Sequence, residues 1–72
     1  MDRQTAEKLN AITLESYFKI HDAVDIVRNG LPEGDERKEY VMGLGRALGY
    51  LYTDVLSPIY KEYPDLKPDN IA

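Results

Sequence analysis

The segment VMGLGRALGYLYTDVL, residues 41–56, decides the fold, because aliphatic residues recur through it at the spacing of an α-helix. Successive residues of a helix are 100° apart, so side chains three and four positions apart lie on the same side. One apolar stripe follows from this spacing, and it is formed by Val41, Leu44, Leu48, Leu51, Val55 and Ile59. The sequence therefore predicts an amphipathic helix whose aliphatic stripe faces a core.

A second line of residues lies about a quarter of a turn from that stripe and consists of Gly45, Gly49, Tyr52 and Leu56. Each glycine inside a helix costs about 1 kcal/mol relative to alanine, so a gain in packing or binding is needed to offset it. We predict that Gly45 and Gly49 lie against another helix. Close packing against the first helix is favoured over ligand binding, because the Gly-x-x-x-Gly spacing lets two backbones approach each other.

Upstream, the chain has no proline or glycine from Thr5 to Asn29, which predicts one long helix over about residues 4–29. Ala11, Leu14 and Phe18 are expected on the side opposite its main apolar face, where a helix packed on a single partner is normally polar. A further partner is expected to cover them. The predicted core face itself comprises Leu9, Ile12, Tyr17, Ile20, Ala23, Val24 and Val27.

A short loop over residues 30–35 joins this helix to the second one, which is predicted over about residues 36–57. Such a short connection makes the two helices antiparallel neighbours. Pro58 has no backbone N–H to donate to Asp54, so the chain either kinks and continues or restarts as a short helix over about residues 58–63. An extended tail is expected over residues 64–72. The predicted fold of residues 1–72 is one all-α domain, a two-helix antiparallel hairpin.

Composition indicates how so small a domain is stabilised. The 72 residues include no cysteine and one histidine, which excludes disulfides and argues against a structural zinc site. Association is the remaining source of stability, so we expect a homodimer that forms a four-helix bundle. Residues expected at an interface are Ala11, Leu14, Phe18, Gly45, Gly49, Tyr52 and Leu56.

Charge and hydropathy limit the other classes of partner. The net charge of −4 argues against binding to nucleic acid. The longest nearly uncharged run, residues 40–53, is too short to cross a bilayer and contains Arg46. We therefore expect no membrane partner, and the absence of a basic start followed by an apolar segment gives an expectation of a cytoplasmic location.

Candidate chemistry is sparse. His21 and Asp25 are four residues apart and could share a metal, but two further ligands would be needed, so the prediction is a solvated or interface histidine and no metal. Tyr50 points away from the aliphatic stripe, and together with Arg46 and Asp54 it is a candidate contact for a partner or ligand.

No catalytic motif and no cofactor motif is present in the sequence. The expected function is a small interaction or regulatory module without chemistry of its own. The alternative is a helical dimer that binds a small molecule or metal and that could be an enzyme subunit. The residues around the ligand would then be His21, Arg46, Tyr50 and Asp54.

Overall fold

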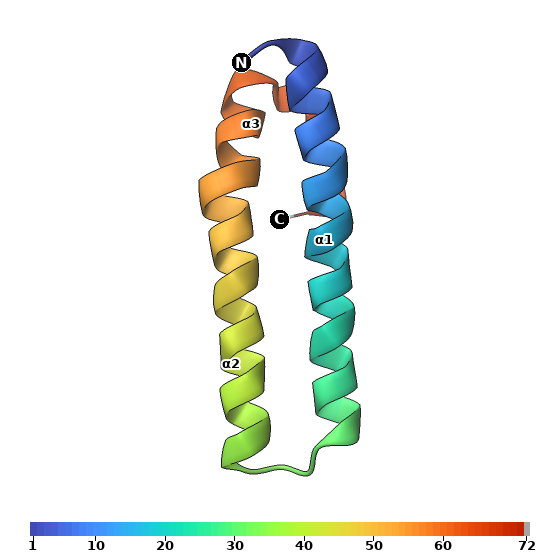
Figure 1. The fold of residues 1–72 in the computed structure, drawn as a ribbon, viewed down its shortest axis with the longest axis vertical. Coiled ribbons are helices and arrows are strands. Elements are labelled where there is room, and N and C mark those ends of the chain that lie inside the picture. The colour runs from blue at the N-terminus through green and yellow to red at the C-terminus, as the bar shows by residue number, and fades with distance from the viewer. Residues whose placement is uncertain (72) are drawn as a thin grey trace.

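The protein is an all-α helical hairpin in a computed structural model that describes residues 1–71. Helix α1 (Arg3–Gly30) runs the length of the molecule, and α2 (Asp35–Tyr50) returns antiparallel to it. The second arm continues through a π-helical turn, η1 (Leu51–Leu56), and α3 (Ser57–Glu62), and a 3-10 turn, η2 (Pro64–Leu66), follows. The hairpin measures 45 × 18 × 16 Å, so it is a long rod only two helices wide (Figure 1).

Helix α1 begins where the Asp2 carboxylate accepts a hydrogen bond from the backbone N–H of Thr5 at 3.3 Å. A side-chain acceptor here satisfies one of the donors that the first turn leaves free. At the other end of the hairpin, Gly34 precedes α2 with a φ of 152°, a conformation that residues with a Cβ rarely adopt. Gly34 therefore sets the direction in which the second arm leaves the loop.

The face of α1 that meets the second arm follows an alternating spacing of four and three residues. Its members are all at least partly buried, and they are Ala6, Asn10, Thr13, Tyr17, Ile20, Val24, Val27 and Leu31. This spacing is that of a coiled-coil seam. The sequence-based core face was wrong at its N-terminal end, because Leu9 and Ile12 are 39% and 69% exposed. The seam there uses small or polar residues, which a search for apolar periodicity does not detect.

The π-helical turn moves the seam of the second arm by one residue. Before the turn the seam of the second arm consists of four partly buried residues, Arg37, Val41, Leu44 and Leu48. The same spacing would continue to positions 51, 55, 58 and 62. After the turn Leu56 and Ile59 are buried instead, while Pro58 is exposed. The Ser57 N–H bonds to the carbonyl of Tyr52, five residues back, which places one extra residue in the turn. The helix thus continues past Pro58 without a break.

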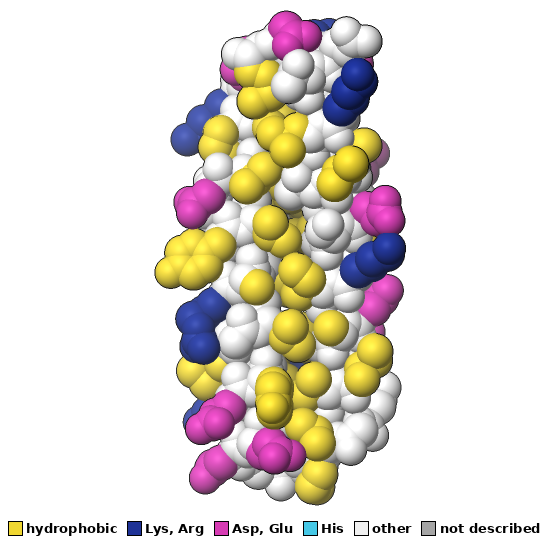
Figure 2. Space-filling model, in the orientation of Figure 1, with side chains coloured by type: hydrophobic (Ala, Val, Ile, Leu, Met, Phe, Trp, Pro, Cys, Tyr) yellow, Lys and Arg dark blue, Asp and Glu magenta, His cyan; other side chains and the backbone are white. Residues whose placement is uncertain are grey.

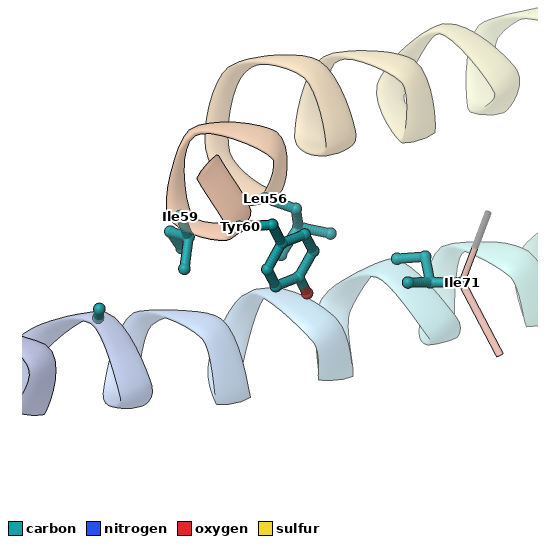
Figure 3. Close-up of a cluster of buried hydrophobic side chains, with 5 residues drawn as sticks. Leu56, Ile59, Tyr60 and Ile71 are labelled. Carbon is teal, nitrogen blue, oxygen red and sulfur yellow. The ribbon is translucent and has the colours of Figure 1, made fainter. Parts of the chain in front are cut away.

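The core is confined to the end of the hairpin that carries the two chain termini. Its buried residues are Ala6, Leu56, Ile59, Tyr60 and Ile71. Figure 3 shows Leu56, Ile59 and Tyr60 directed from the second arm towards α1, with Ile71 of the tail against the same helix. The tail is therefore not simply extended, since a 3-10 turn starts it and Ile71 anchors it in the core. By contrast, α2 contains no buried residue.

Candidate interaction surface

The two sides of the hairpin differ in what covers them. One side carries residues two helical turns apart on each arm: Leu9, Ser16 and Ala23 on α1, and Tyr40, Ala47 and Asp54 on the second arm. Leu9 and Asp54 both line one cleft near the chain termini. The three α1 residues and the three residues of the second arm therefore lie on the same side of the hairpin. We call this side the open face.

The opposite side, which we call the tail face, carries Leu14 and His21 of α1 with Gly45 and Tyr52 of the second arm. The chain after α3 covers its terminal half and passes behind α1 in Figure 1. Leu14 and Tyr52 pack against the core there, and the Asn10 side chain donates to the Leu66 carbonyl at 3.5 Å. The tail thus supplies a cover that the sequence-based prediction assigned to a partner chain.

Two predictions for the second arm, the exposure of Leu56 to a partner and the packing of Gly45 and Gly49 against the first helix, are corrected within one chain. Leu56 is fully buried within one chain, because the π-helical turn rotates it into the seam, so it cannot reach a partner. Gly45 and Gly49 do not pack against α1, since a Cβ on either residue would have no atom within 4 Å apart from its own helix and chain neighbours. Phe18 and Ala11 remain exposed on α1.

Large apolar side chains are exposed along the whole open face. Ile12 and Ile26 lie at the α1 edge of this face and are 69% and 72% exposed, and Tyr40 and Tyr50 on α2 are 59% and 66% exposed. In Figure 2 hydrophobic side chains run down the middle of this side over both arms, and Lys, Arg, Asp and Glu lie mainly at its edges and ends. Contiguous exposed apolar surface of this kind marks an interaction site in soluble proteins.

A cleft of about 320 Å³ hollows the open face near the chain termini. It is lined by Leu9 of α1 and, on the second arm, by Asp54, Val55, Pro58 and Glu62. Leu9 and Asp54 belong both to this cleft and to the open face. The cleft is therefore part of one surface that extends along the hairpin.

The residues predicted to surround a ligand are not gathered in one chain. Asp54 belongs to the open face, whereas His21 belongs to the tail face, where its ring packs edge-on against Tyr17 at 4.9 Å between centroids. In residues 1–71 no three metal-ligating side chains come together, so His21 and Asp25 have no further ligand beside them in one chain. Arg46 is exposed on the outer side of α2, and Tyr50 is exposed at the α2 edge of the open face.

Polar contacts hold the two chain ends together beside the cleft. The Arg3 guanidinium forms a bidentate ion pair with the Asp65 carboxylate. The Tyr63 hydroxyl donates a hydrogen bond to the Met1 carbonyl at 2.7 Å. The hydrogen bond from Arg3 holds the pKa of Asp65 below its usual value. These contacts fix the terminal end of the open face and offer no reactive group.

Sequence reasoning identified Tyr50 but placed Leu9 and Ile12 in the core, because they lie at helical spacing with other apolar residues, and it gave Ile26 no role. The signal that separates them is the strict alternation of four and three residues, which excludes positions 9, 12 and 26 from the seam.

Comparison with known proteins shows that no family model, no curated protein and no solved structure matches this chain. Over residues 1–71, none of the helices combines the length and the hydropathy that crossing a bilayer requires.

Proposed function

We propose that this protein is a small cytoplasmic interaction module whose output is a protein contact made by the open face, without catalytic chemistry of its own. The observation that supports the proposal is the line of exposed apolar side chains that follows both arms over the length of the hairpin. Covering such a face removes apolar surface from water at about 25 cal/mol per Å².

The structure of the hairpin supports the same proposal. The buried core occupies one end of the rod only, and α2 buries no residue of its own. A chain of 72 residues without cysteine has few other sources of stability. A protein partner on the open face would supply the missing second layer.

Photo-cross-linking in cells tests this proposal. A benzophenone amino acid replaces Tyr50 on the open side of α2 in one variant and Phe18 on α1, outside the open face, in a matched control. Both positions are aromatic and at least partly exposed in the chain, at 66% and 36%. We expect protein adducts from position 50 and few from position 18. Equal yields, or no adduct from position 50, would contradict the proposal.

A further inference from the structure

We propose that the partner on the open face is a second copy of this chain, packed face to face to form a four-helix bundle; this inference rests on the proposed function. Four helices in two layers enclose a core that two helices leave exposed on one side. The hairpin would then be one half of a symmetric molecule.

The size of the open face matches what a stable dimer needs. The outline of this side, 45 by 18 Å, is about 800 Å², so a contact along its whole length is of the size at which each partner buries roughly 800 Å² in a standard interface. A smaller partner would leave some of the exposed apolar side chains of the open face in water. A second hairpin has the same length and covers the line from the cleft to the loop.

The composition of the face suits a contact between identical surfaces. In a two-fold dimer each residue meets the same surface of the other chain, so charges on the face would be brought together with like charges. Of the six residues that define the open face, only Asp54 is charged, and it lies near one end; Lys19, which lies between Ile12 and Ile26 at the α1 edge of the face, is paired with Glu15 of the same chain. Apart from Asp54, the charges that make up the net charge of −4 lie outside the six residues that define the open face.

The tail supports the choice of the open face over the opposite one. On the tail face, residues Pro64 to Ile71 already cover Leu14 and Tyr52 at the terminal end. A second hairpin could lie flat there only if the tail left its site, which would expose Ile71 and the Asn10 side chain. The open face has no such obstacle along its length.

Sedimentation velocity of the full chain at low to high micromolar concentrations tests the inference. We expect about twice the chain mass of 8.2 kDa for the wild type. Ile26→Glu places a carboxylate on the contact and should raise the dissociation constant by about tenfold or more. The matched control, Met42→Glu, changes an exposed apolar residue of α2 outside the open face and should leave the dimer unchanged.

A variant that loses its partner can also lose its helices, so the wild type provides a second measurement. The melting temperature of a dimer rises with protein concentration, and that of a monomer does not. A wild type that is monomeric at every concentration, or a dimer that Met42→Glu weakens as much as Ile26→Glu does, would overturn the inference. The proposed function would then still be decided by the cross-linking from position 50, which also detects a different protein.

Discussion

The Tyr60 hydroxyl donates a hydrogen bond of 2.6 Å to the side-chain oxygen of Asn10, inside the core and between the two arms of the hairpin. The Asn10 amide donates in turn to the Leu66 carbonyl, so one buried asparagine links α1 to both α3 and the tail. A buried polar pair of this kind fixes one register between helices, because any other register leaves its groups unpaired.

Removing one member of this pair should cost more than removing a surface contact. We expect Tyr60→Phe to lower the free energy of unfolding by about 1 kcal/mol and Asn10→Ala by about 2 kcal/mol. The double variant should lose less than the sum, with a coupling of about 0.5 kcal/mol or more. Urea unfolding of the four proteins at one fixed concentration measures this coupling, and a value near zero would show that the pair does not act as a unit.

Alkaline pH should also act on this core. Burial raises the pKa of the Tyr60 hydroxyl above its usual value of 10.0. The folded state therefore holds the Tyr60 proton more tightly than the unfolded chain does. The stability that comes from the protonated Tyr60 hydroxyl is complete below pH 10 and is lost as the pH rises through the folded pKa. We expect Tyr60→Phe to lose less stability than the wild type between neutral pH and alkaline pH, measured by thermal melting.

The π-helical turn should be removable by deleting one residue. Deletion of Thr53 in a Pro58→Ala background lets the second arm become a continuous α-helix while Ile59 and Tyr63 keep their places on the seam. We expect this variant to keep its helix content in circular dichroism and to melt cooperatively. Deletion of Glu15, an exposed residue inside α1, is the control and should unfold the hairpin, because it rotates half of the seam by 100°.

Alanine at Gly45 or Gly49 should stabilise the protein. The added methyl group would meet open space at both positions, so alanine gains helix propensity of up to about 1 kcal/mol without a clash. Gly34→Ala is the control and should destabilise, because its φ of 152° strains any residue with a Cβ. A drop in melting temperature for Gly49→Ala would instead place a partner on the tail face.

Acid should release the ends of the chain. The pKa of Asp65 lies below its usual value of 3.8 because Arg3 donates hydrogen bonds to the carboxylate. The stability that the ionised Asp65 carboxylate gains from Arg3 is therefore complete above pH 3.8 and is lost as the pH falls through the lower pKa of the folded state. Carboxyl carbon shifts measured by NMR should show the Asp65 midpoint rising in Arg3→Gln, and an unchanged midpoint would show that the pair does not form in solution.

The hairpin itself could be predicted from the sequence, because residues 41–56 have a strong helical period and the loop is marked by Pro32 and Gly34. The register could not, because Asn10 and Thr13 are polar yet buried, and Tyr60, the partner of Asn10, is distant in the sequence. Local periodicity also carries no sign of a tail that folds back, so the burial of Ile71 and the cover over Leu14 were not foreseen.

The most direct test of the open face as a contact between two copies is an isotope-filtered NMR experiment on wild-type protein, mixed from labelled and unlabelled chains. Only protons of different chains give cross-peaks in such a sample. We predict intermolecular cross-peaks from the methyl groups of Leu9, Ile12 and Ile26, and none from Met42 on α2. Cross-peaks confined to Met42 and Phe18, or no intermolecular cross-peak at high concentration, would contradict a contact between two copies through the open face.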